Sequence, residues 1–203
     1  MSVKYMGSKR AMLGNGLGEA LSRAMPNANR VLDLFTGSAA VAWHIAENHG
    51  KEVIACDLQQ YATILAASVI ERTEAIIDYA WLDAWFRSAR ARIASHRDWK
   101  ALKGHQARLG DDDLATIAEE ARAFDLGVRY PISKAYGAHY FSPWQSAWLD
   151  ALRASLPVDP TVRNIGLAAP IQAASRCVLA RLASCGRRVS NAIRDARQSG
   201  ALP

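Results

Sequence analysis

An α/β fold is predicted for this chain of 203 residues. Two short apolar runs, Arg30–Phe35 and Val53–Cys56, have the length and composition of buried strands. Each is followed by a segment with the apolar spacing of a helix, Ser38–His49 after the first run and Gln59–Val69 after the second. Strand, helix, strand and helix in this order are typical of a βαβ unit with parallel strands and a right-handed crossover.

Further helices are predicted on both sides of this unit. The segment Lys9–Ala24 places apolar residues on one face, although three glycines weaken the pattern. Aromatic and aliphatic residues recur at helical spacing over residues 74–86, and Gly127–Tyr140 has the composition of a loop. Ser142–Gln145 contains the residues of a capping box, which predicts a helix start. A last helix is expected over Val162–Ala183.

The change in composition along the chain predicts three segments. Residues 1–73 form the βαβ portion, residues 74–160 are helical, basic and aromatic, and residues 161–203 combine a helix with a polar tail. The sequence after about residue 177 resembles nothing that we recognise.

Composition limits the class of protein. Half of the residues are hydrophobic and 22% are charged, so the chain is able to form a buried core. The net charge of +6 favours an anionic partner. Apolar runs are too short for a membrane span, and we expect a cytoplasmic protein. Three cysteines without CxxC spacing argue against a disulfide framework and a metal site, and we expect them to be reduced and buried.

The segment Asp33–Ala39 (D-L-F-T-G-S-A) carries the first chemical signal, because it joins the first strand to the following helix. A small glycine-containing turn there lets a ligand approach the backbone, and the helix start offers unpaired amide groups. Asp57 follows the second strand and is able to accept hydrogen bonds from ribose hydroxyls. The pattern predicts a nucleotide-cofactor site; the alternative is an ordinary tight turn with a chance acid.

A second signal is the basic stretch Arg87–Arg108. Phosphate contacts need cations on one face, and Arg90, Arg92 and Arg97 are the candidates. The alternative is a solvated helix face, which is the more common role of such a stretch.

Two motifs resemble the DNA adenine methylase family, whose members begin with Tyr/Trp-x-Gly-Gly-Lys and continue with Asp-x-Phe-x-Gly-x-Gly. Ser8 replaces the second glycine of the first motif, and Ala39 stands where the last glycine of the second is expected. The family's ribose-binding acid corresponds to Asp57. Tyr140–Pro143 is similar to a segment that leads to target recognition in some members. The positions that the resemblance assigns to the cofactor are Tyr5, Gly7, Lys9, Asp33, Phe35, Gly37 and Asp57.

The resemblance implies a Rossmann-like, S-adenosylmethionine-dependent methyltransferase sheet, incomplete in this chain, with a mostly helical recognition segment. The implied reaction transfers a methyl group from S-adenosylmethionine to the exocyclic amine of adenine in double-stranded DNA, in a restriction-modification setting. Tyr140 joins the three arginines as a DNA-binding candidate, because an aromatic ring is able to stack on a displaced base.

One motif of the family is absent. Members carry Asp/Asn-Pro-Pro-Tyr/Phe, which holds the flipped adenine. The chain has seven prolines and no Pro-Pro pair, and its nearest approach is Asp159–Val162. We therefore assign no catalytic residue and expect a truncated or frameshifted, inactive product with part of its core uncovered. Two alternatives stay open, a non-catalytic cofactor- or DNA-binding remnant and a methyltransferase for small molecules.

Overall fold

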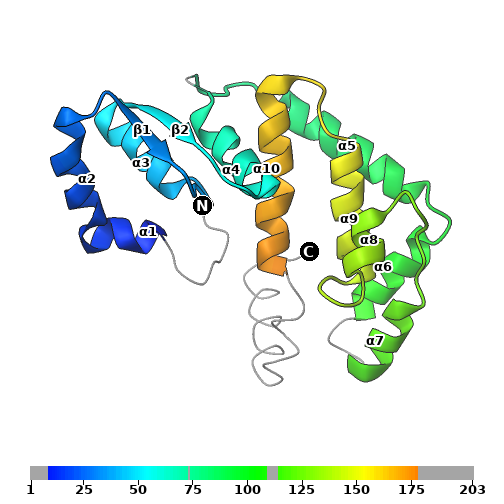
Figure 1. The fold of residues 1–203 in the computed structure, drawn as a ribbon. Coiled ribbons are helices and arrows are strands. Elements are labelled where there is room, and N and C mark those ends of the chain that lie inside the picture. The colour runs from blue at the N-terminus through cyan, green and yellow to red at the C-terminus, as the bar shows by residue number, and fades with distance from the viewer. Residues whose placement is uncertain (1–8, 73, 109–113, 178–203) are drawn as a thin grey trace. The chain divides into compact units, whose positions relative to one another are not determined.

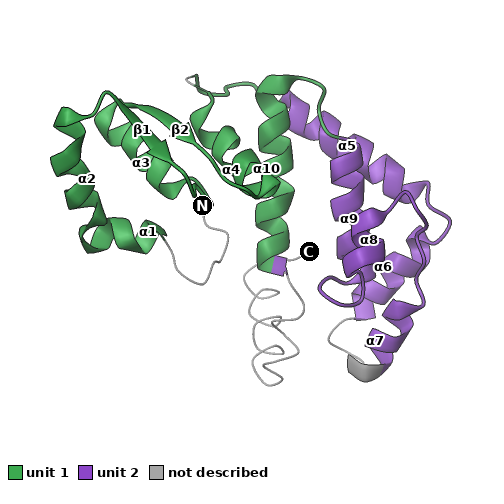
Figure 2. Ribbon diagram, viewed as in Figure 1, with its two compact units in different colours: residues 1–79, 156–176 green, residues 80–155, 177–203 purple. Residues whose placement is uncertain are grey.

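The computed structural model describes residues 9–72, 74–108 and 114–177, which are mostly helical and include one parallel sheet of two strands (Figure 1). The α/β class is confirmed in this coarse form. The chain divides into two compact units (Figure 2). Unit 1 contains residues 1–79 and 156–176, and unit 2 contains residues 80–155 and 177–203. The division into three segments stays a prediction.

Unit 1 contains the predicted βαβ unit. Its elements are β1 (Arg30–Asp33), α3 (Ala40–His49), β2 (Glu52–Ala55) and α4 (Gln60–Ile70). The strands are parallel, and Leu32 pairs with Ile54. Gly50 ends α3 in the left-handed conformation, with φ of 57°, and its amide donates to the Ala46 carbonyl. Glycine suits this position because it has no Cβ to clash with the backbone.

The single helix predicted over Lys9–Ala24 is broken in the structure. It consists of α1 (Lys9–Met12) and α2 (Gly18–Ala24), joined by a distorted turn over Leu13–Leu17. Gly16 in this turn has φ of 97°, outside the helical region. The break therefore lies at the glycines that weaken the sequence pattern, where the backbone is least constrained. A 3₁₀ turn, η2 (Met25–Asn27), leads to β1.

Helices cover one face of the sheet. Val53 and Ala55 of β2 pack with a buried cluster that contains Ala39 and Ala66. On the opposite face Leu32 is 59% exposed and its partner Ile54 is 37% exposed. Parallel sheets are normally covered on both faces. The expectation that part of the apolar surface is uncovered is thus confirmed for these residues.

Unit 2 is helical. Ala89 and Ile93 of α5 (Ala80–Ala94) form a buried cluster with Ala151 of α9 (Pro143–Ala154), and tryptophans pack against it. The Trp85 indole donates a hydrogen bond to the Leu152 carbonyl at 2.9 Å, which satisfies the polar atom of a buried ring. The helices are α5 (Ala80–Ala94), α6 (Trp99–Arg108), α7 (Leu114–Arg122), α8 (Pro131–Tyr136) and α9 (Pro143–Ala154).

Two boundaries in unit 2 differ from the sequence prediction. The helix expected from residue 74 begins at Ala80, and Ile77 and Tyr79 are exposed in an irregular segment. Helical spacing is not sufficient where the apolar side chains have no surface to pack against. The predicted loop Gly127–Tyr140 contains helix α8, for which a distant residue supplies the missing start signal.

That residue is Asp150 of α9, which is buried. Its carboxylate accepts hydrogen bonds from the Ile132 amide at 2.9 Å and from the Ser133 amide and hydroxyl at 2.7 and 2.8 Å. These amides lie in the first turn of α8, and the N-cap residue of this helix, Tyr130, accepts no hydrogen bond from them through its side chain. A negative charge also suits the positive end of the helix dipole. By contrast, the capping box predicted at Ser142 is confirmed and local.

The last described helix is α10 (Pro160–Cys177), which belongs to unit 1 apart from its final residue. Its Asn164 amide donates to the Glu71 carboxylate at 3.0 Å. The end of the predicted helix, residues 178–183, lies outside the described residues. No helix in the described part of the chain is long and apolar enough to cross a membrane. The expected burial of the cysteines is wrong for Cys56 and Cys177, which are exposed.

Substitution of Asp150 tests the origin of α8. Asp150→Ala leaves two partly buried helix-start amides without an acceptor and should lower the free energy of unfolding by about 3 kcal/mol. Asp125→Ala removes a single exposed hydrogen bond, to the Gly127 amide, and should have a much smaller effect. Urea unfolding followed by the tryptophan fluorescence of unit 2 measures both. Equal stability of the two variants would contradict the assigned role of Asp150.

Candidate functional site

The two parallel strands end in a pair of linked turns. The Cys56 amide donates to the Asp33 carbonyl at 2.8 Å, and the Thr36 amide donates to the Cys56 carbonyl at 2.9 Å. The parallel hydrogen-bond pattern therefore continues past the strands into the segment that precedes α3. Gly37 follows with φ of 54°, a conformation that favours glycine.

Asp57 links these turns through its carboxylate. One oxygen accepts the Gly37 amide at 2.9 Å, and the other accepts the Gln59 amide at 2.9 Å. Hydrogen bonds from the Gln59 and Gly37 amides hold the pKa of the Asp57 carboxyl below its usual value, and the charge of Lys9 adds to this effect. The group is thus ionised near neutral pH. Each carboxylate oxygen keeps a further lone pair that a ligand hydroxyl is able to use.

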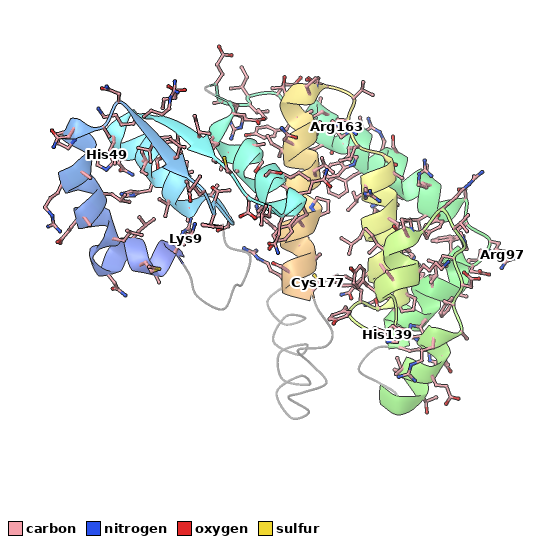
Figure 3. All side chains as sticks on the ribbon, in the orientation of Figure 1. Lys9, His49, Arg97, His139, Arg163 and Cys177 are labelled. Carbon is pink, nitrogen blue, oxygen red and sulfur yellow. The ribbon has the colours of Figure 1, made fainter. Side chains whose placement is uncertain are left out.

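Asp33 and Lys9 meet at the end of β1. The Lys9 ammonium lies 3.3 Å from one Asp33 carboxylate oxygen and also donates to the Phe35 carbonyl. The second Asp33 oxygen and the Thr36 hydroxyl are buried without a hydrogen-bond partner among the described residues. Buried polar atoms are normally paired, so two unpaired ones beside a turn point to a ligand-binding position. Figure 3 labels Lys9 at the start of α1.

The backbone conformation of Ala39, at the start of α3, explains why the family motif has a glycine at this position. It has φ of 60°, a left-handed conformation that is costly for alanine and natural for glycine. Ala39 is fully buried in the cluster with Ala42 and Ala66. No side chain caps α3, so its first amides remain available to an anionic ligand group.

The turns are open to solvent. Phe35 is 70% exposed and Leu58, which follows Asp57, is 97% exposed. Two hollows, of about 760 and 340 Å³, are lined by other residues, one at α6 and α7 and one at α4 and α10. A ligand at the turns would therefore lie at the open carboxyl ends of the two strands. The turns thus present the carboxylates of Asp33 and Asp57, the unpaired hydroxyl of Thr36 and an uncapped helix start, which are partners for ammonium, hydroxyl and anionic groups of a ligand.

The structure brings most of the predicted cofactor residues together. Lys9, Asp33 and Phe35 share one set of contacts, and Gly37 is joined to Asp57. Tyr5 and Gly7 lie outside the described residues. Sequence reasoning missed Thr36, whose burial has no sequence signal beyond its place between Asp33 and Gly37.

The predicted DNA-binding arginines do not share one face. Arg90 and Arg92 are both exposed on α5, but positions two apart on an α-helix point about 200° apart around its axis. Arg97 follows the end of α5, lies at the periphery of unit 2 (Figure 3), and pairs with Asp98 at 3.3 Å. Arg87 is the exposed arginine that lies nearest in angle to Arg90, because the two are three residues apart.

Two later residues of the basic stretch, His105 and Arg108, have structural contacts. His105 is buried, and a nitrogen of its ring lies 3.0 Å from the Ile117 carbonyl. Arg108 forms a two-point ion pair with Glu120. Tyr140 is half exposed and meets the ring of Tyr136 edge to face at 5.8 Å. Arg87, Arg90 and Arg92 of α5, together with Tyr140, thus present accessible groups. In the described part of the chain, no group of three or more His, Cys, Asp or Glu residues is able to hold a metal ion.

Comparison with known families identifies the segment that contains the turns. Residues 5–89 match the D12 class N6 adenine-specific DNA methyltransferase family. The resemblance inferred from the motifs is confirmed for this segment, which is less than half of the chain. No curated protein and no solved structure gave a match. The match to this family implies S-adenosylmethionine as the methyl donor and DNA as the substrate.

Proposed function

We propose that this chain carries the cofactor-binding part of an S-adenosylmethionine-dependent, adenine-specific DNA methyltransferase. The observation that carries the proposal is the pair of linked turns at the strand ends, located within the segment that matches the family. We further propose that β1 and β2 belong to a Rossmann-like sheet, because they are parallel and joined by a crossover helix. A cytoplasmic restriction-modification system is the proposed setting.

Each residue of the turns has a role in the proposal. Asp57 accepts hydrogen bonds from the ribose hydroxyls, and Gly37 keeps the backbone open to the ligand. The Asp33 carboxylate and the Thr36 hydroxyl provide polar partners at the end of β1. When bound, S-adenosylmethionine supplies a methyl group on a sulfonium centre. The residues of the chain position it, which is the larger part of catalysis in a direct transfer to an amine.

DNA binding is proposed for unit 2. The net charge of the whole chain, +6, favours an anionic partner, and within unit 2 the exposed arginines of α5 supply mobile cations. Tyr140 presents a half-exposed ring for a displaced base. Arg97 contributes less in this proposal, because its charge is already balanced by Asp98.

We propose that this chain binds the cofactor and DNA but does not catalyse methyl transfer. A flipped adenine needs an acceptor for its amine and a ring against its face. No Pro-Pro pair is present to hold such groups rigidly, and Asp159, in the nearest segment, accepts the Thr161 amide at the start of α10. The second candidate, a cofactor- or DNA-binding protein without catalysis, is favoured by this absence. The small-molecule methyltransferase has no observation in its favour.

Substitution of Asp57 tests the cofactor proposal. Asp57→Ala removes the acceptor for the ribose hydroxyls and should weaken S-adenosylmethionine binding by about 1–3 kcal/mol. Asp57→Asn keeps one oxygen acceptor and should show a smaller loss. Glu47→Ala, an exposed acid on α3, is the matched control and should bind like the wild type. Titration calorimetry measures all four proteins; equal affinity of wild type and Asp57→Ala, or no binding by any of them, would count against the site.

The salt dependence of DNA binding tests the basic surface. Neutralised phosphates release counterions, so replacing Arg90, Arg92 and Arg97 by Ala should reduce the slope of log K against log salt by up to about 2.7. Arg97 should account for the smallest share. Replacement of Arg10, Arg23 and Arg163, which are exposed in unit 1, is the charge-matched control. Fluorescence anisotropy with a DNA duplex measures the slope. Equal slopes for both triple variants would show that the basic stretch is a solvated helix face without a specific role in DNA binding.

Methyl transfer tests the absence of turnover. Purified chain, duplex DNA and S-adenosylmethionine with a labelled methyl group should give no adenine methylation above a no-protein control, because the sequence lacks the Asp/Asn-Pro-Pro-Tyr/Phe motif that accepts the amine. Transfer clearly above that control would show that another group performs this role. Asp159→Ala would then identify whether it is the acceptor.

A further inference from the structure

The contact of Lys9 with the end of β1 carries an inference that deepens the proposed function and rests on it. The Lys9 ammonium is held by two acceptors, the Asp33 carboxylate and the Phe35 carbonyl. A carboxylate and a backbone carbonyl placed together form a binding position for an ammonium group, which has only donors to offer. The end of β1 is therefore a cation subsite that the chain fills with its own side chain.

The two partners differ in their surroundings. The Asp33 side chain is 10% exposed, whereas that of Lys9 is 37% exposed and comes from the start of α1. The carboxylate is thus fixed, while the lysine is able to move into solvent at modest cost. The buried oxygen of Asp33 that lacks a partner shows that Lys9 does not use the full capacity of this carboxylate.

The subsite lies beside the turns proposed for the cofactor. The Asp33 carbonyl accepts the Cys56 amide just past the end of β2, and the residue after Cys56 is Asp57, the proposed ribose acceptor. An amino-acid nucleoside bound there would bring its own ammonium to the end of β1. Two ammonium groups repel each other at contact distance, so they are unable to share these acceptors without a cost.

We propose that Lys9 is an internal competitor for the ammonium group of the cofactor's amino-acid portion. In the free protein the lysine neutralises Asp33 and covers the Phe35 carbonyl. Binding of the ligand displaces the lysine into solvent, and the affinity measured for the ligand is lowered by the stability of the lysine contact.

Two related nucleosides isolate this effect. S-adenosylhomocysteine carries the amino-acid portion, and 5′-methylthioadenosine has the same adenine, ribose and thioether without it. Lys9→Met removes the competing charge and keeps the length of the side chain. It should bind S-adenosylhomocysteine about tenfold more tightly, the factor that corresponds to one charge-assisted hydrogen bond, and bind 5′-methylthioadenosine as the wild type does. Lys9→Arg retains the charge and should stay near wild type, as should the control Lys51→Met.

A second measurement does not depend on any variant. Acetylation of Lys9, followed by mass spectrometry, should become faster when wild-type protein is saturated with S-adenosylhomocysteine and should not change with 5′-methylthioadenosine. Lys51 serves as the internal reference. Circular dichroism confirms that each variant is folded before binding is compared.

Each other outcome overturns the inference. Weaker binding of S-adenosylhomocysteine to Lys9→Met would show that the lysine holds the ligand, for example through the carboxylate of the ligand. Unchanged affinity, or an equal gain for both nucleosides, would show that no competition for an ammonium occurs. If neither nucleoside binds to the wild type or to Lys9→Met, the proposed function fails and this inference fails with it.

Discussion

The carboxylate of Asp57 is the interaction on which the geometry of the candidate site depends. It binds the Gly37 amide on one side and the Gln59 amide on the other, and so joins the turn after β1 to the start of α4. In the described residues the sheet has two strands, and its backbone pairing continues to Thr36 and Cys56 but does not include Gly37 or Gln59. An ionised group that receives two backbone amides supplies that constraint, and its lowered pKa is the electrostatic sign of the same contacts.

Sequence reasoning succeeded where the signals are local. The βαβ order, the turn at Gly37 and the capping box at Ser142 depend on residues close together in the chain, and each is found in the structure. It failed where the deciding partner is distant or missing. Helix α8 depends on Asp150, and Ile77 remains outside a helix because its side chain has no partner surface. The larger sheet and the binding roles are proposals that extend from a sheet of two strands in the described residues.

The candidate DNA surface shows a different limit of sequence analysis. A run of basic residues predicts an electrostatic character, but a helix distributes consecutive residues around its whole circumference. Arg87 and Arg90 emerge on similar faces, whereas Arg97 and Arg108 are engaged with Asp98 and Glu120. The number of cations available to a phosphate backbone is therefore smaller than the number of basic residues in the stretch.

The origin of α8 in a side chain of α9 also determines how unit 2 opens. A helix as short as α8 does not persist alone in water, so it exists only while Asp150 remains packed beneath it. The amides of Ile132 and Ser133 then exchange with solvent deuterium only when the α8–α9 pair separates. Their exchange rate reports on the cooperativity of the whole helical unit rather than on local fraying of a six-residue helix.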